Sequence, residues 1–227
     1  TLIALSVAAV PVVAGEKLPV IKLPPIKMPK LEGQKKSDVN QRTGNEGTVG
    51  VGWNVKYGYE ALKNHTNNHN AGKHNTAIGV SAMRSNTEGD HNTATGYGAL
   101  YSNTTGNYNT ASGHGTLYSN TTGSYNTANG FNALHWCGDE RRNCRNNTAT
   151  GYGALYRNEG RSNTASGYAA LNENNRGNHN TALGYGTLTK NLNTSRNTAV
   201  GAVALNNNTQ GEENTAVGAQ ALFLNNT

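Results

Sequence analysis

The sequence predicts an all-β protein, a parallel β-solenoid of about ten 17-residue coils preceded by an extended N-terminal arm. The first observation is a nine-residue pattern, Asn-Thr-Ala-x-Gly-Tyr-x-Ala-Leu, that recurs along residues 54–227. The second is the composition, in which only 34% of residues are hydrophobic and 14% are charged, while Gly, Asn and Thr are abundant. Such a chain has little apolar material for a globular core, so its order must come from repetition and backbone ladders.

The repeat has a nearly constant period. Its first Asn falls at positions 75, 92, 109, 126, 147, 163, 180, 197 and 214, after a degenerate copy that starts at Asn54. A period of 17 is about half that of helix-pair repeats, and Gly together with β-branched Thr in every unit disfavours helix. We therefore expect two short strands per coil, one at Asn-Thr-Ala-x-Gly and one at x-Ala-Leu-x, with turns between them.

Nearly invariant columns indicate the core. Position five is Gly in every copy, and positions eight and nine are almost always Ala and Leu. Coils stacked at about 4.8 Å would turn these columns into interior ladders, with Asn side chains hydrogen-bonded along the axis. The expected core ladder is Leu100, Leu117, Leu134, Leu155, Leu171, Leu188, Leu205 and Leu222. The mostly aromatic position six is either a stacked packing column or an exposed adhesive stripe.

Two longer steps interrupt the repeat. The step from 126 to 147 contains both cysteines, and we expect Cys137 and Cys144 to form a disulfide that closes a loop at 135–146. Such a bridge indicates an oxidising compartment, whereas a zinc site lacks further ligands here. The step from 54 to 75 contains histidines at 65, 69 and 74, which we interpret as part of a polar loop and not as a metal site.

The first 50 residues differ in kind from the repeats. Residues 1–15 are an apolar, strand-like leader, and residues 16–50 are a Lys/Pro-rich extended arm and linker before the repeat domain at 51–227. The leader resembles part of a secretory signal, but we take it as a retained segment that is too short to span a bilayer. We expect it to be a self-assembly arm with the apolar residues Ile3, Leu5, Val7, Val10 and Val12.

The sequence lacks the residue patterns of common catalytic and ligand-binding sites. It contains no nucleophile with a base, no paired carboxylates at usable spacing, no phosphate loop and no calcium-binding Gly-Asp turn. We therefore expect a protein that is not an enzyme and needs no cofactor or metal. Much of the net charge of +6 lies in the lysines of the arm, without interleaved aromatic residues, so we expect no nucleic-acid partner.

Asn-x-Ser/Thr triplets provide candidate N-glycosylation sites. Most of them fall in the corner segments between the predicted strands, where an attached sugar would fit. A chain this rich in Asn and Thr also contains such triplets by chance. The candidates are Asn64, Asn103, Asn120, Asn146, Asn193, Asn207 and Asn225.

The segments 75–79 (Asn-Thr-Ala-Ile-Gly) and 197–201 (Asn-Thr-Ala-Val-Gly) resemble the Ser-Val-Ala-Ile-Gly repeats in the heads of trimeric autotransporter adhesins. Similar repeats occur in phage tail-fibre-like proteins. The resemblance covers residues 54–227 and implies a left-handed parallel β-roll, trimeric and exposed outside the cell. The chain departs from that family in its longer period and in having Asn-Thr in place of Ser-Val, so trimerisation and the secretion route do not carry over.

Three functions fit these features. We expect a structural subunit of a self-assembling extracellular fibre or surface appendage, which polymerises through the apolar arm and through stacking of solenoid ends. The alternative is a cell-surface adhesin or phage tail-fibre-like protein that binds glycans or a host surface through its tyrosine column and Asn-rich corners. The third is an ice-binding solenoid built on the Thr at position two. Two features count against it, namely the corner insertions and the presence of only one Thr per coil in this column.

The same features set our expectations for location and partners. We expect an extracellular or cell-surface protein without a membrane span, because the disulfide and the candidate glycosylation sites both belong to that environment. The expected partners are other copies of the chain, covalent glycans or host-surface glycans.

Overall fold

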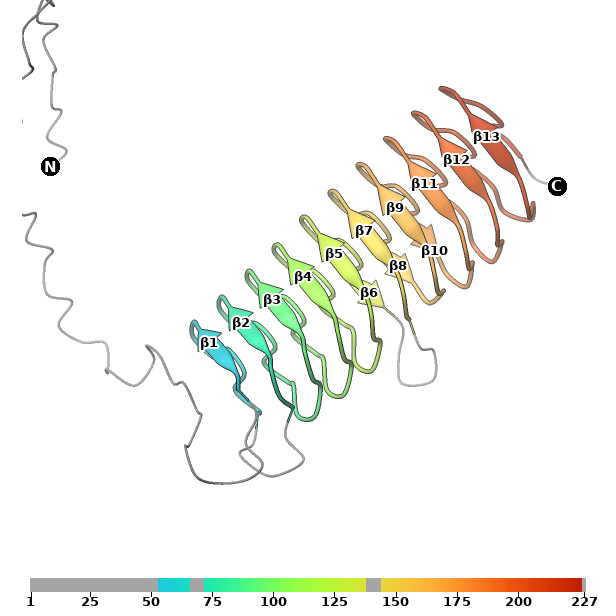
Figure 1. Cartoon of the computed structure of the whole chain (residues 1–227). Coiled ribbons are helices and arrows are strands. Elements are labelled where there is room, and N and C mark those ends of the chain that lie inside the picture. Colours follow the sequence, from blue (N-terminus) through green and yellow to red (C-terminus); the bar gives the residue numbers. More distant parts are fainter. Residues whose placement is uncertain (1–52, 66–71, 138–143, 226–227) are drawn as a thin grey trace, which may run out of the picture. The chain divides into compact units, whose positions relative to one another are not determined.

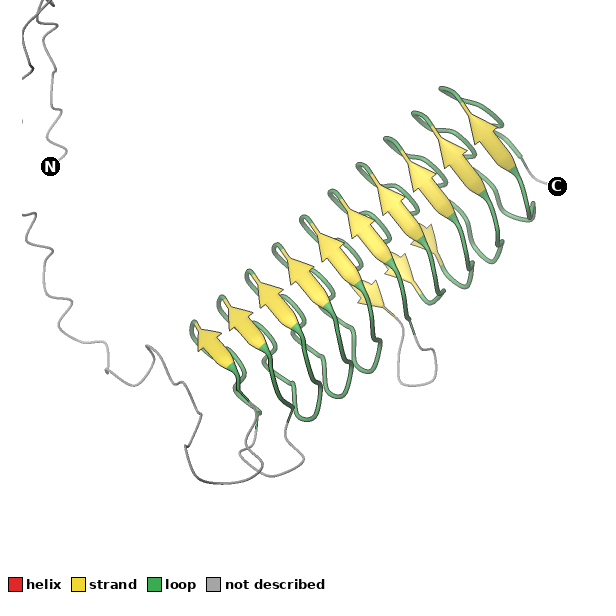
Figure 2. Cartoon of the chain, in the orientation of Figure 1, coloured by secondary structure: helices red, strands yellow, loops and turns green. Residues whose placement is uncertain are grey.

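The computed structural model describes residues 53–65, 72–137 and 144–225. These residues form a parallel β-solenoid, all-β and without a helix in the described ranges, which confirms the predicted fold class (Figure 1). The coils follow one another along the axis in chain order (Figure 2). The leader with Ile3, Leu5, Val7, Val10 and Val12, the arm, and the predicted boundaries at 15 and 50 lie outside the described residues.

One short strand per coil builds the main sheet, whose ten parallel strands are stacked in chain order. Equivalent repeat positions pair with each other, as Thr93 pairs with Thr110 and Ala94 with Ala111. The strands are β1 (Val55–Tyr57), β2 (Thr76–Ile78), β3 (Thr93–Thr95), β4 (Thr110–Ser112), β5 (Thr127–Asn129), β7 (Thr148–Thr150), β9 (Thr164–Ser166), β11 (Thr181–Leu183), β12 (Thr198–Val200) and β13 (Thr215–Val217).

A second parallel sheet is smaller. It contains β6 (Trp136–Cys137), β8 (Arg157–Asn158) and β10 (Glu173–Asn174), in the order β10-β8-β6. These strands occupy positions eleven and twelve of their coils. Our prediction of a strand at x-Ala-Leu-x was therefore wrong, because that segment forms a turn in every described coil.

The turn is made by a left-handed backbone at position nine. Its φ lies between 46° at Leu205 and 52° at Leu100 in all ten coils, a conformation that costs a residue with a side chain about 1 kcal/mol or more. Burial of the same leucine contributes roughly 2 kcal/mol, which offsets the backbone cost. The strained turn thus persists because it directs the leucine side chain into the coil.

Glycine at position five sets the spacing between coils. Its φ lies between 122° and 137°, a region that side chains strongly disfavour. A Cβ atom there would approach the carbonyl oxygen of the equivalent glycine in the next coil, for example to 2.6 Å between Gly130 and Gly151. Both the backbone angle and the close approach of neighbouring coils therefore require glycine.

The interior is thin and contains one ladder of leucine and two of alanine. The described core confirms seven of the eight predicted leucines, which are fully buried: Leu100, Leu117, Leu134, Leu155, Leu171, Leu188 and Leu205. Leu222 is 49% exposed, so its assignment to the core was wrong. It lies in the last described coil, where no further coil covers it among the described residues.

Candidate functional site

The first Asn of each coil forms a buried ladder along the solenoid. Its backbone N–H donates to the side-chain oxygen of the previous Asn, as from Asn92 N to Asn75 Oδ1 at 2.9 Å. Its Nδ2 donates to a corner carbonyl, as from Asn92 to Gly106 O at 2.8 Å. From Asn54 to Asn197 these amides are almost completely shielded from water, and each coil satisfies polar groups of its neighbour.

A second buried ladder runs through the Asn at position twelve. Asn103 Nδ2 donates to Asn86 Oδ1 at 2.7 Å, and Asn120 Nδ2 donates to Asn103 Oδ1 at 2.9 Å. The same Nδ2 groups donate to the corner glycine three residues later, as from Asn103 to Gly106 O at 3.0 Å. Each of these asparagines therefore closes its own corner and also joins two coils.

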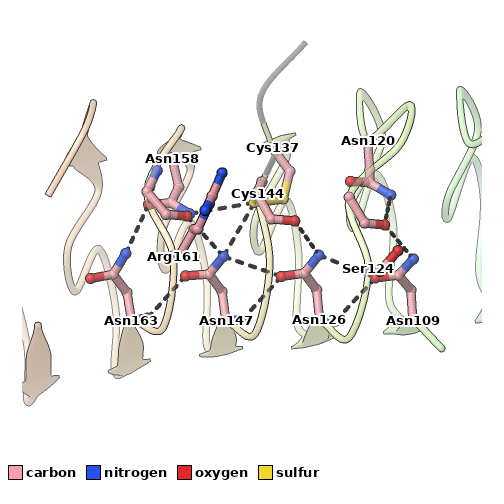
Figure 3. Close-up of a disulfide and its surroundings, with 12 residues drawn as sticks. Asn109, Asn120, Ser124, Asn126, Cys137, Cys144, Asn147, Asn158, Arg161 and Asn163 are labelled. Atoms are coloured by element: carbon pink, nitrogen blue, oxygen red, sulfur yellow. Dashed lines mark hydrogen bonds between the residues drawn. A yellow bond between two sulfur atoms is a disulfide. The ribbon is translucent and has the colours of Figure 1, made fainter. Parts of the chain in front are cut away.

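The disulfide between Cys137 and Cys144, predicted from the sequence, lies within this second ladder (Figure 3). Cys137 occupies position twelve, where neighbouring coils have Asn120 and Asn158. Cys144 occupies the corner, where its carbonyl accepts from Asn126 Nδ2 at 3.0 Å, as the carbonyl of a corner glycine does in other coils. The disulfide thus replaces the hydrogen bond that elsewhere links position twelve to the corner.

The cysteine pair interrupts the asparagine ladder. Asn120 Oδ1 is buried and has no hydrogen-bond partner among the described residues, since Cys137 in the next coil has no side-chain N–H group to donate. The ladder resumes at Asn158, whose Oδ1 accepts from Asn174 Nδ2 at 2.7 Å. Asn158 Nδ2 also lies 3.4 Å from Cys144 Sγ. A covalent bond therefore stands at the point where the polar ladder is broken.

Aromatic rings form three columns on the surface. Neighbouring rings stack with centroids 4.7 to 5.2 Å apart, as Tyr101 does on Tyr118 and Tyr168 on Tyr185. The column at position six is both stacked and exposed, since Tyr97 packs on His114 and still exposes 56% of its surface. Its members are Tyr97, His114, Phe131, Tyr152, Tyr168 and Tyr185. The ring faces cover each other, so mainly ring edges and hydroxyl groups are available to a ligand.

Titratable side chains with shifted pKa values are few and scattered. His135 stacks between Tyr118 and Tyr156, and burial lowers its pKa, although a contact of 2.8 Å from its Nδ1 to Gly115 O opposes the shift. Burial also lowers the pKa of His65. Hydrogen bonds first from Lys63 and then from Arg84 lower the pKa of Glu60.

These groups do not form a metal centre in the described ranges. No cluster of three or more His, Cys, Asp or Glu side chains there could hold a metal ion. His65 contacts Asn54 at 3.0 Å and His74 stacks on His91, while the histidine at 69 lies outside the described residues.

The candidate glycosylation sites differ sharply in exposure. Asn103 and Asn120 are fully buried ladder residues whose Nδ2 atoms are hydrogen-bonded, so their proposed role was wrong for the folded chain. Their recurrence at position twelve was the signal in the sequence that could have shown this. Asn225 is partly buried and donates to Asn208 Oδ1 at 3.1 Å. The exposed candidates are Asn64, Asn146 and Asn193, and Asn207 is partly exposed.

The fold and these ladders define a disulfide-containing β-solenoid repeat protein. Comparison with protein-family models, with curated proteins and with solved structures gives no match. No helix of the described ranges has the length and apolar character needed to cross a bilayer.

Proposed function

We propose that the chain is a structural subunit of an extracellular fibre or surface appendage and has no catalytic activity. The observation that carries this proposal is the pair of asparagine ladders. In both ladders, buried asparagines of one coil hydrogen-bond to the preceding coil, as Asn92 does to Asn75 and Asn103 does to Asn86. A solenoid of this kind is suited to a stiff, repetitive spacer.

Assembly of copies would occur through coil stacking. The last described coil exposes 49% of Leu222 and 71% of Leu224, whereas the equivalent Leu205 of the preceding coil is fully buried. Stacking of a second copy there would bury Leu222 and Leu224 and pair the edge of β13 that has no partner strand among the described residues. The apolar N-terminal leader would add a further contact by strand addition.

The disulfide supports an extracellular location for the fibre. A bridge between Cys137 and Cys144 persists in oxidising compartments and is rare in reducing ones. The exposed Asn146 and Asn193 are compatible with covalent glycans on the same surface.

Negative-stain microscopy and sedimentation of the full chain test the proposal. We expect filaments that are lost on Leu222→Asp and on deletion of residues 1–14, because each change removes one assembly contact. The exposed corner substitution Gln210→Asp serves as the control and should leave filaments intact. A wild-type chain that stays monomeric at all concentrations would contradict a fibre role.

The half-exposed aromatic columns favour adhesion as the second candidate function. The edges and hydroxyls of Tyr152, Tyr168 and Tyr185 could hydrogen-bond to a host-surface glycan. Binding on a glycan array that is lost on Tyr168→Ala would support this role. A chain that binds no glycan and forms filaments would favour the fibre.

A further inference from the structure

The outward face of the main sheet carries no charged side chain in nine consecutive coils. We call the residues at positions two and four of β2 to β13 the threonine face, because position two is Thr in every one of these coils. Its residues are Thr76, Thr93, Thr110, Thr127, Thr148, Thr164, Thr181, Thr198 and Thr215 in one column and Ile78, Thr95, Ser112, Asn129, Thr150, Ser166, Leu183, Val200 and Val217 in the other. Of the charged residues described, only Lys56 lies on a main-sheet strand, and it belongs to β1.

The two columns of this face are regular in register and spacing. Thr pairs with Thr at each step, including the long step at which Thr127 pairs with Thr148. The inserted residues of that coil therefore leave the face in register, contrary to the objection that corner insertions raise. Neighbouring strands place the threonines about 4.8 Å apart along the axis, and positions two and four lie about 6.7 Å apart across it.

The second column adds hydrogen-bonding groups that a single Thr per coil would lack. In five consecutive strands, β3, β4, β5, β7 and β9, position four is also polar: Thr95, Ser112, Asn129, Thr150 and Ser166. This stretch of the face is thus a two-column array of hydroxyl and amide groups. Toward one end, Leu183, Val200 and Val217 replace these groups with apolar side chains.

Hydroxyls of the threonine face are used differently from those elsewhere in the solenoid. At the corners and turns, Thr87 donates to Thr104 O, Thr104 donates to Thr121 O and Thr187 donates to Gly201 O. The exposed Thr110, Thr127 and Thr148 make no side-chain hydrogen bond to any described residue. Their hydroxyl groups are therefore not occupied by a described residue.

Strand propensity does not account for this constancy. Position four of the same strands accepts six residue types, from Ile78 and Leu183 to Asn129. The fold therefore tolerates varied side chains on this face, yet position two is always the one β-branched residue that carries both a methyl and a hydroxyl group. A requirement for that pair of groups at a fixed interval explains the column.

We propose that the threonine face binds the surface of ice. A soluble partner is recognised by a local cluster of different side chains, whereas a crystal presents the same contact at each repeat. Hydroxyl groups at a fixed interval hydrogen-bond to ordered water, and the methyl groups between them hold water only weakly. Charged groups would retain their own hydration, and the face excludes them. This activity is independent of the fibre role.

Inhibition of ice recrystallisation by the full chain tests the proposal, with thermal hysteresis as a second readout. Thr127→Lys with Thr148→Lys places two charges at the centre of the face and should reduce the activity at least tenfold. The matched control is Thr105→Lys, an exposed corner threonine outside the face, which should leave activity unchanged. Circular dichroism reports whether each variant is folded.

Thr127→Val with Thr148→Val keeps the shape and β-branching of the face, so it remains informative if the lysine variant fails to fold. A several-fold loss is expected because two hydroxyl groups are removed. A wild-type chain without effect on ice growth would overturn the proposal, as would equal losses from the Thr105 and Thr127/Thr148 lysine variants. Retention on crystalline cellulose or chitin without an effect on ice would also overturn it and would assign the face to a solid polysaccharide.

Discussion

Restoring the interrupted asparagine ladder should compensate for the loss of the disulfide in the free energy of unfolding. In most coils, position twelve is Asn and the corner is Gly, so Cys137→Asn with Cys144→Gly gives the disulfide coil the pattern of its neighbours. The new side-chain amide would donate to the unpaired Asn120 Oδ1 and to the carbonyl at the corner. The glycine is needed because a Cβ at the equivalent Gly123 would lie 2.2 Å from Asn120 Oδ1.

In this double variant, the stabilisation lost with the disulfide and the stabilisation gained from new hydrogen bonds nearly cancel. Loss of a bridge that spans seven residues removes about 2.5 kcal/mol of loop-closure stabilisation. Two buried hydrogen bonds return about 1 kcal/mol each, and pairing a buried orphan acceptor adds roughly 1 kcal/mol more. The unfolding free energy of Cys137→Asn/Cys144→Gly should therefore lie within about 1 kcal/mol of the oxidised wild type. Cys137→Ala/Cys144→Ala, which gains no hydrogen bond, should be less stable by about 2.5 kcal/mol.

Urea unfolding followed by circular dichroism measures these differences, with and without a reductant. Because repeat arrays can unfold in parts, hydrogen exchange at the amides of Asn126 and Asn147 gives the local value next to the bridge. Reductant should weaken only the wild type. Equal instability of the Asn/Gly and Ala/Ala variants would refute the equivalence between the disulfide and the ladder.

Four further outcomes are expected. Gly130→Ala should cost more than 3 kcal/mol, since it combines a φ of 127° with a close carbonyl, whereas Gly153→Ala, at a φ of 60° with only a side chain nearby, should cost about 1 kcal/mol; thermal unfolding compares the two. Leu155→Ala should destabilise by about 2 to 5 kcal/mol and the half-exposed Leu222→Ala by well under half of that, as urea titration would show. Burial lowers the pKa of His135, so its contribution to stability is complete above the exposed-histidine pKa of about 6.5 and is lost as the pH falls through the lowered value; His135→Tyr should therefore flatten the fall in melting temperature between about pH 7.5 and 5. In a glycosylating host, peptide mapping should find sugar on Asn146 or Asn193 and none on Asn103 or Asn120.

Most of the architecture could be predicted from the repeat spacing. Stacking of equivalent positions follows directly from a fixed period, and so do the leucine ladder and the disulfide within the longer step. The pattern of residue types within one coil predicted the strands less well. The segment x-Ala-Leu-x has the composition of a strand, but the conformation at Leu100 and its equivalents depends on packing of the side chain into a coil that is only a few residues wide.

The roles of the asparagines could not be derived from a single coil. Asn103 satisfies its amide with groups from the preceding coil and from its own corner, and a sequon read as a local triplet does not include those partners. The threonine face could not be predicted from the sequence either, because its second column varies in residue type. Only the register of the sheet shows that Thr95 and Thr150 extend the array begun by position two.

The amide-filled interior determines how stability should respond to temperature. Exposure of apolar surface raises the heat capacity of unfolding, whereas exposure of buried amides lowers it. Most coils of this solenoid bury two asparagines along with one leucine and two alanines, so the heat capacity change per residue should fall below that of a globular protein of the same length. A smaller change flattens the stability curve and weakens the driving force for cold denaturation. The same ladders that join coil to coil would therefore keep the rod folded in water close to freezing.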